Sequence, residues 1–432
     1  MELLDAGVLA GSFLLLLALG VPISFSLGIA TTVTILMNIM TIPALTTVAQ
    51  RMATGIDSFT LLAIPFFILS GQLMNKGGIA KRLISFAKVI VGRFHGGLAF
   101  VNILACMLFG AISGSAVAAA AAIGGFMIPL MIKEGYNREF SAAINITSST
   151  TGLLIPPSNV LIVYSLASGG ASIAALFLAG YLPGILVGGS LMFISFIYSR
   201  KHKYKSHEKI NFKQAVKSFF DVIPSLLLLI IVMGGIVAGI FTATEASAIA
   251  VLYTFVLSVA IYREVKIKDL PKIILNTVNI TAIVMLLVAT SMAMSWILSF
   301  ENIPQSISAA LISLTQNKII ILLIINFILL CIGTFMDITP AILIFTPIFL
   351  PVVTQLGLDP VHFGIIMVLN LNIGICTPPV GNALFVGCSV ANISLLKVIK
   401  PLMPFFISMI ISLLIVTYIP EISLIIPKIF GF

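Results

Sequence analysis

The chain has 432 residues, of which 60% are hydrophobic and only 9% are charged, and its mean hydropathy is +1.21. A soluble domain carries roughly 25% charged residues, so this composition excludes an ordinary soluble protein. The net charge of +9 would suggest nucleic-acid binding in a soluble chain, but basic residues crowd into two loops, 200–217 and 263–272. Two apolar runs separate these loops, so the positive-inside rule places both in the cytoplasm, and we expect no nucleic-acid partner.

Apolar runs long enough to cross a bilayer, which takes about 20 residues per helix, recur along the whole chain. Their residues do not alternate apolar with polar as barrel strands do, so we predict an all-α polytopic membrane protein embedded in a lipid bilayer. A segment at 81–94 has basic residues at helical spacing with apolar residues between them, which predicts an amphipathic helix at the membrane surface. The candidate spans are 8–32, 57–75, 97–131, 141–168, 171–198, 222–241, 243–262, 273–299, 318–353, 362–393 and 402–428.

The residues that commonly carry enzyme chemistry are sparse and scattered. The four cysteines lack metal-binding spacing, the four histidines lie in or beside loops, and no P-loop, HExxH or GxSxG pattern occurs. We therefore predict that the chain is not an enzyme, needs no cofactor and does not use ATP directly.

Landmarks in the two halves of the chain match at an offset of 222 residues, which indicates an internal repeat. Gly152 and the pair Pro156–Pro157 match Gly374 and the pair Pro378–Pro379. In each half, a long apolar run interrupted by small and polar residues precedes a run broken at a Gly-x-x-x-Pro-Pro centre. The interrupted runs are too long for one span and too short for two. We therefore predict two re-entrant hairpins, at about 97–131 and 318–353, and two broken helices, at about 141–168 and 362–393.

The repeat predicts an organisation in four parts. Residues 1–56 form an N-terminal scaffold region, and 57–199 form the first repeat with its interfacial helix. Residues 200–272 supply the basic cytoplasmic loop and the linking scaffold helices, and 273–432 form the second repeat.

The paired prolines explain why a membrane-spanning run would be interrupted. Proline removes a backbone donor and clashes with the preceding helical turn. The N-termini of the resulting half-helices favour anions, while unwound carbonyls and Ser or Thr oxygens can coordinate sodium. Small residues also serve close helix packing, and prolines also kink helices without a binding role. The occurrence of two matched copies favours a binding site.

Four segments resemble the large membrane subunit of tripartite ATP-independent periplasmic (TRAP) transporters, the DctM type: SGSAVAAAAAIGGFMIPLM, GLLIPPSN, GTFMDITPAILIFTPIFLPV and NIGICTPPVGNALFV. The resemblance runs essentially from end to end. It implies sodium-coupled import of a small carboxylate, such as a sialic acid, a sugar acid or a C4-dicarboxylate, in a bacterial inner membrane. It also implies two partners, a small four-helix membrane subunit and a periplasmic substrate-binding protein, together with inverted repeats and an elevator-type motion.

The resemblance further implies two sodium sites, with the substrate between the two hairpin tips. The first tip and first break supply one set of expected sodium ligands, Ser113, Gly114, Ser115, Ser149, Thr151, Gly152 and Pro156. The second tip and second break supply the other, Gly333, Thr334, Asp337, Gly374, Cys376, Thr377 and Pro378. The expected substrate-binding residues are Ser113, Ser115, Asn145, Asp337, Thr339 and Asn372. Asn145 and Asn372 are 227 residues apart, so the repeat itself does not support this pair.

Asp337 is the only acid between Glu301 and Asp359. An ionised group inside a membrane is costly and is by default a functional candidate. Its other role would be to cap the helix that leaves the second tip. A channel-like or ion-translocating subunit of a larger complex remains the alternative function, although such a protein would favour several charges along one path.

Overall fold

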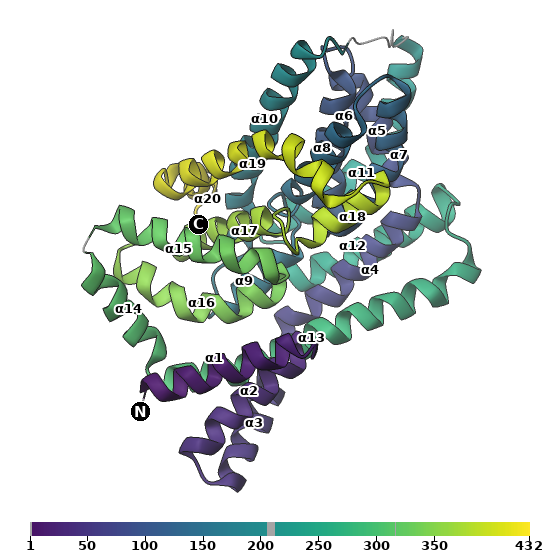
Figure 1. The fold of residues 1–432 in the computed structure, drawn as a ribbon. Helices are drawn as coiled ribbons and strands as arrows, with labels where there is room; N and C mark the ends of the chain where they lie inside the picture. Colours follow the sequence, from purple (N-terminus) through teal and green to yellow (C-terminus); the bar gives the residue numbers. More distant parts are fainter. Residues whose placement is uncertain (1, 205–211, 316) are drawn as a thin grey trace.

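The computed structural model describes residues 2–204, 212–315 and 317–432, and all regular secondary structure in these ranges is helical (Figure 1). Nine of the described helices are long and apolar enough to cross a membrane. The α-helices are α1 (Glu2–Ala18), α2 (Ile23–Asn38), α3 (Thr41–Ile56), α4 (Ala63–Lys76), α5 (Ile79–Val91), α6 (Gly97–Ser113), α7 (Ala116–Lys133), α8 (Arg138–Thr151), α9 (Asn159–Ala167), α10 (Ile173–Lys201), α11 (Phe212–Val237), α12 (Ala243–Phe255), α13 (Leu270–Phe300), α14 (Ile303–Leu314), α15 (Lys318–Phe335), α16 (Ile338–Gln355), α17 (Pro360–Gly374), α18 (Asn382–Ala391), α19 (Leu395–Tyr418) and α20 (Glu421–Ile429).

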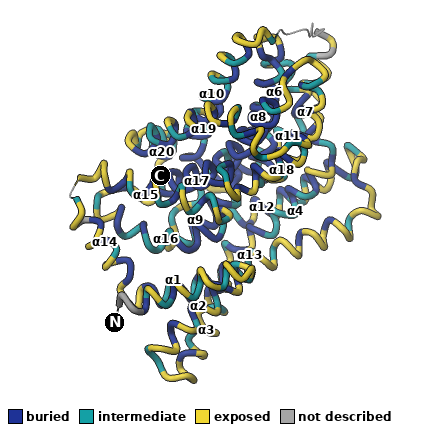
Figure 2. Tube along the Cα trace, viewed as in Figure 1, coloured by how far each residue is buried: buried dark blue, intermediate teal, exposed yellow. Residues whose placement is uncertain are grey.

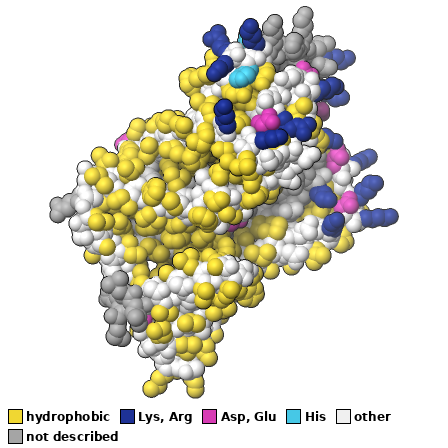
Figure 3. All heavy atoms as spheres, viewed as in Figure 1, with side chains coloured by type: hydrophobic (Ala, Val, Ile, Leu, Met, Phe, Trp, Pro, Cys, Tyr) yellow, Lys and Arg dark blue, Asp and Glu magenta, His cyan; other side chains and the backbone are white. Residues whose placement is uncertain are grey.

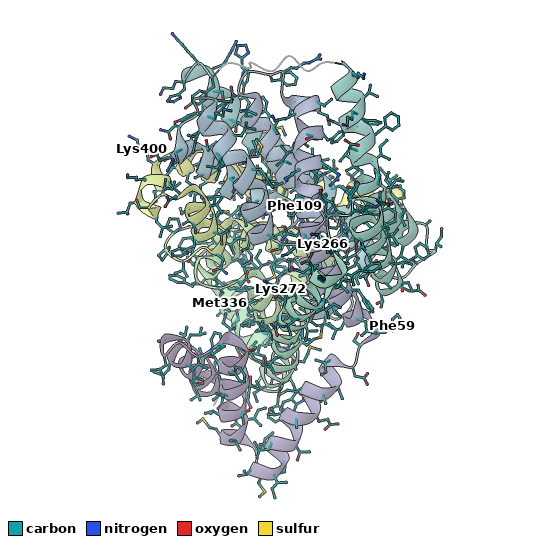
Figure 4. The ribbon with its side chains drawn as sticks, turned by 90° about the vertical axis from the view of Figure 1, so that its right-hand side faces the viewer. Phe59, Phe109, Lys266, Lys272, Met336 and Lys400 are labelled. Atoms are coloured by element: carbon teal, nitrogen blue, oxygen red, sulfur yellow. The ribbon has the colours of Figure 1, made fainter. Side chains whose placement is uncertain are left out.

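The two runs with polar interruptions each form a helix, a tight turn and a second helix. The first tip lies between α6 and α7, where Gly114 has a φ of +61° and the Ser115 side chain caps α7. The second tip lies between α15 and α16, where Asp337 caps α16. Figure 4 shows Met336, which precedes Asp337, about midway along the height of the molecule. That the two repeats are inverted relative to one another stays a prediction.

Both runs with Pro-Pro centres are divided into two shorter helices. Residues 152–158 separate α8 from α9, and residues 375–381 separate α17 from α18. The peptide bonds Pro156–Pro157 and Pro378–Pro379 are both cis. Figure 2 shows that α8, α9 and α17 lie among the most buried parts of the molecule.

Matched glycines bring each hairpin against its broken helix. A Cβ atom built on Gly110 of α6 would lie 2.7 Å from the Cα of Gly152, at the end of α8. In the other half, a Cβ on Gly333 of α15 would lie 3.0 Å from the Cα of Gly374, at the end of α17. Real Cβ atoms are not found at the shorter of these separations, so the backbones approach this closely only because both partners are glycine. In each half, the C-terminal ends of two helices therefore meet.

Two apolar runs and two helices differ from the sequence prediction. The run 8–32 is not one span, because Gly20 with a φ of +81° and Pro22 end α1 and precede α2. The run 402–428 is likewise divided, between α19 and α20. The helices α3 and α14 were not predicted; α3 is less apolar than its neighbours, with Thr, Gln and Arg in its sequence.

Charged side chains gather on one side of the molecule. Figure 3 shows Lys and Arg over the far end of α10, near α5 and α7, and at the turn between α12 and α13, while hydrophobic side chains cover much of the remaining face. The amphipathic segment forms α5, whose Arg82 guanidinium stacks 3.6 Å from the centroid of the Tyr262 ring and lies 3.9 Å from the Glu264 carboxylate. This contact fixes α5 to the second basic loop.

The close glycine contacts yield a prediction for stability. In Gly374→Ala, the new Cβ would lie 2.5 Å from the Cα of Gly333, and overpacking of this kind costs about 1–3 kcal/mol. We expect a lower melting temperature in detergent. Gly189→Ala is the matched control, because nothing lies within 4 Å of its Cβ and Ala favours a helix. Equal melting temperatures for the two variants would contradict the prediction.

Candidate functional site

A cavity of about 240 Å³ lies between α4, α13, α9 and the two tips. This volume lies just below the range of about 300–1,000 Å³ that is typical of ligand pockets, so the cavity suits a small molecule. Its lining includes one charged residue, Asp337. The lining residues are Ile64, Ile68, Gly71, Gln72, Asn75, Ser113, Gly114, Ser115, Ala116, Val117, Ala118, Leu153, Asn159, Val160, Val163, Ile280, Val284, Asp337, Ile338, Thr339 and Ile375.

The first tip presents the N-terminus of α7 to this cavity. The Ser115 hydroxyl accepts a hydrogen bond from the Ala118 N–H at 3.2 Å, and the Ser113 hydroxyl donates to the Ser115 carbonyl at 3.5 Å. The positive φ of Gly114 disfavours any residue with a Cβ, and the Asn159 side chain lies against this glycine. All three predicted residues of the first tip therefore lie at the cavity.

The second tip presents Asp337 and Thr339 to the same cavity. The Asp337 Oδ1 accepts a hydrogen bond from the Ile338 N–H at 2.8 Å. The carboxylate therefore caps α16 and lies at the cavity at the same time. The two roles considered for Asp337 are thus compatible.

The predicted sodium ligands of the first break lie behind the cavity lining. Ser149 and Thr151 are buried in the last turn of α8, and their hydroxyls donate to carbonyls three residues earlier, at 2.8 Å and 2.6 Å. Each hydroxyl oxygen keeps lone pairs that could face a cation. Gly152 contacts α6 through Gly110, and Pro156 is buried in the irregular segment.

The second break is arranged similarly. The Thr377 hydroxyl donates to the Ile373 carbonyl at 2.8 Å, and the half-buried Thr334 donates to the Cys331 carbonyl at 2.7 Å. The Cys376 thiol donates instead across the repeats, to the Ile146 carbonyl at 3.5 Å. Because thiols are soft ligands and sodium prefers oxygen, Cys376 would serve a sodium site through its backbone. Gly333, Gly374 and Pro378 complete this predicted set beside the second tip.

Two predicted substrate residues, Asn145 and Asn372, lie outside the cavity lining. The Asn145 amide donates to the Ala120 carbonyl at 2.9 Å, which holds α8 against α7. Asn372 is buried in α17, and both its side-chain polar atoms lack a hydrogen-bond partner in the described part of the chain. The structure therefore separates this pair from the residues at the tips.

The sequence prediction missed three amides that line the cavity, Gln72, Asn75 and Asn159. Asn159 is the last residue of GLLIPPSN, one of the segments that carry the family resemblance, and Gln72 lies in the apolar run AIPFFILSGQLM. The only signal in the sequence was an amide side chain in an apolar run, and only the fold shows that all three face one cavity.

Comparison with known proteins assigns the chain to a family. The family model described as the tripartite ATP-independent periplasmic transporter, DctM component, matches residues 10–422. The chain belongs to this family. It is 56% identical over 98% of its length to the YgiK protein of Salmonella typhimurium, of which it covers 97%. It is 37% identical, over 99% of its length, to the complete C4-dicarboxylate TRAP transporter large permease DctM of Rhodobacter capsulatus.

A solved structure shares the fold at low sequence identity. The YdaH transporter of Alcanivorax borkumensis superposes with a TM-score of 0.61 at 15% identity, covering 86% of this chain and 87% of that one. The chain is thus a multi-pass helical TRAP permease component and not an enzyme, as the sequence predicts.

The two roles of Asp337 can be separated by substitution. Asn caps helices as well as Asp, so Asp337→Asn should keep the fold while removing the charge. We expect its transport activity to fall at least about tenfold, because a hydrogen bond to a charged group is worth about 1.5–3 kcal/mol. The melting temperature should stay unchanged.

Asp337→Ala serves as the comparison, because it removes the cap as well as the charge and should lower the melting temperature. Uptake is measured in proteoliposomes at matched protein abundance. Normal uptake by Asp337→Asn would show that the side chain only caps α16.

Proposed function

We propose that the chain is the sodium-coupled permease that imports a small organic acid across the bacterial inner membrane by elevator-type alternating access. The observation that carries this proposal is the shared cavity, which both hairpin tips line and in which Asp337 is the one charged residue among the described lining residues. An organic acid is an anion and sodium is a cation. The helix ends near this cavity include both N-termini, which favour anions, and C-termini, which favour cations.

The N-terminal helix ends suit the carboxylate of the substrate. The helices α7 and α9 both begin at the cavity, and Asn159, the first residue of α9, lies against Gly114 in the first tip. Helix N-termini carry unsatisfied N–H groups and partial positive charge, which favours an anion. Ser115 caps α7 with a neutral hydroxyl, so the positive end of that helix is not already compensated.

The C-terminal helix ends suit sodium. The ends of α6 and α8 meet at Gly110 and Gly152, and the ends of α15 and α17 meet at Gly333 and Gly374. Helix C-termini carry free carbonyl groups and partial negative charge, and such groups coordinate sodium in transporters with broken helices. The buried hydroxyls of Ser149 and Thr151 and the half-buried hydroxyl of Thr377 add further oxygens.

The contact of α4 with the first tip supports movement of the hairpins against a scaffold. A Cβ on Gly71 of α4 would lie 2.8 Å from the Ser113 carbonyl oxygen, so a bare backbone surface faces the tip. The other contacts of α4 include α12 and α13. The cavity reaches Asn75, in the last turn of α4, which leads directly into the basic helix α5. Under the positive-inside rule, this arrangement corresponds to a state that faces the cytoplasm.

The family name describes a tripartite periplasmic transporter, which supports the presence of two further components besides this chain. We infer that this chain works with a small four-helix membrane subunit and with a periplasmic protein that delivers the acid. The channel-like alternative has less support, because the described lining of the cavity holds one charge and not a charged path. Uptake that requires both a sodium gradient and the binding protein would favour the importer, while passive flux without either would favour the channel.

The sodium proposal predicts the effect of removing single hydroxyls. Ser149→Ala and Thr377→Ala should each raise the sodium concentration for half-maximal uptake by roughly two- to tenfold, as loss of one ligand worth about 0.5–1.5 kcal/mol implies. The wild-type Hill coefficient for sodium should exceed one if the two sites act together.

The control is Ser313→Ala, because Ser313 is exposed on α14 and its hydroxyl bonds only its own helix. Uptake is measured as a function of sodium concentration in proteoliposomes. A proton gradient that drives uptake equally well in the absence of sodium would refute the proposal.

A further inference from the structure

One face of α4 forms a wall of the cavity opposite the tips. The residues of α4 in the lining are Ile64, Ile68, Gly71, Gln72 and Asn75, and their spacing places them on one side of the helix. The two amides occupy adjacent positions on this face, three residues apart. An otherwise apolar helix therefore places two hydrogen-bonding groups beside the proposed substrate.

These amides have no structural partner. The side chains of Gln72 and Asn75 form no hydrogen bond with the described part of the chain, and Gln72 is half-buried while Asn75 is exposed. Each amide offers two N–H donors and one carbonyl acceptor. Because neither amide bonds the described part of the chain, both are available to a ligand in the cavity.

The charges at the tips favour a substrate with a single carboxylate. The N-terminus of α16 is already capped by the Asp337 carboxylate, whereas the N-terminus of α7 is capped by the neutral Ser115. A second substrate carboxylate at the second tip would face Asp337 and be repelled. The described cavity lining contains no Lys, Arg or His to offset that repulsion.

The rest of the cavity offers neutral hydrogen-bonding groups. The amides of Gln72, Asn75 and Asn159 and the hydroxyl of Thr339 can each donate and accept. Hydroxyl groups on a ligand match such a surface, because a hydroxyl also both donates and accepts. A simple fatty acid would leave these groups without partners.

We propose that Gln72 and Asn75 form the scaffold wall of the substrate site and select a monocarboxylic acid with several hydroxyl groups, such as a sugar acid, over a dicarboxylate. This inference rests on the proposed function, since it assumes that an organic acid occupies the cavity. The carboxylate binds at the first tip, and the hydroxyl groups of the acid bind the α4 amides.

The test measures binding of three acids to the full chain in lipid nanodiscs with sodium present. Gluconate carries one carboxylate and several hydroxyls, hexanoate has the same chain length without hydroxyls, and succinate carries two carboxylates. We expect gluconate to bind most tightly. Gln72→Leu and Asn75→Leu should each weaken gluconate binding about fivefold, the effect of one lost hydrogen bond, and leave hexanoate binding unchanged.

Gln50→Leu is the matched control, because Gln50 is exposed on α3 and does not line the cavity. Stabilisation by sodium alone reports whether each variant is folded, and it should be the same in all four proteins. Tighter binding of succinate than of gluconate, or unchanged gluconate affinity in both α4 variants, would overturn the inference. Failure of the proposed function has another signature, in which neither sodium nor any of the acids stabilises the wild-type chain.

Discussion

Helix ends in the interior of an apolar molecule are the constraint on which the rest of this structure depends. The first and last turns of any helix leave backbone N–H and carbonyl groups without partners, and the hydrocarbon of a membrane offers none. Here the two tips separate α6 from α7 and α15 from α16. The two Pro-Pro segments separate α8 from α9 and α17 from α18. Ser115 and Asp337 satisfy some of these groups locally. Backbone bonds in the adjoining turns satisfy others, such as the bond from the Thr377 N–H to the Gly374 carbonyl. Any group without such a partner is available to the substrate and the sodium ions of the proposed sites.

The arrangement of these ends by polarity would give the proposed sodium coupling its physical basis. At the first tip, α6 ends at Ser113 and α7 begins at Ala116, so a negative and a positive helix end lie close together along the chain. Under the proposed function, a sodium ion at the end of α6 and a substrate carboxylate at the start of α7 would attract each other. Both ligands would then order the same turn. Each ligand would then raise the affinity for the other, as binding linkage requires. At the second tip, the Asp337 carboxylate would attract a sodium ion, whereas it would repel a substrate anion that arrived without sodium.

Glycine has two separate functions in this arrangement. Gly114 provides a turn that residues with a Cβ rarely adopt, whereas Gly110, Gly152, Gly333 and Gly374 allow backbones to touch. Gly71 provides a further close contact, between α4 and the first tip. A smooth backbone contact at that point suits two bodies that slide past each other, because interlocked side chains would resist the movement. The amides of α4 lie one helical position and one turn further along from Gly71, and so line the same cavity as the tips.

The sequence alone determined the helical membrane class, the hairpin segments, both breaks and the family. These features follow from local hydropathy, from proline chemistry and from a repeat that can be read along the chain. It also predicted Ser113, Ser115, Asp337 and Thr339 as site residues, because polar residues in apolar runs are conspicuous, and all four line the cavity. Only the tertiary structure decided that Asn145 braces α8 against α7 and that Gln72 and Asn75 face the tips. The reason is that an amide in an apolar run can either bond a neighbouring helix or face a cavity. Which of the two occurs depends on where helices distant in sequence are packed.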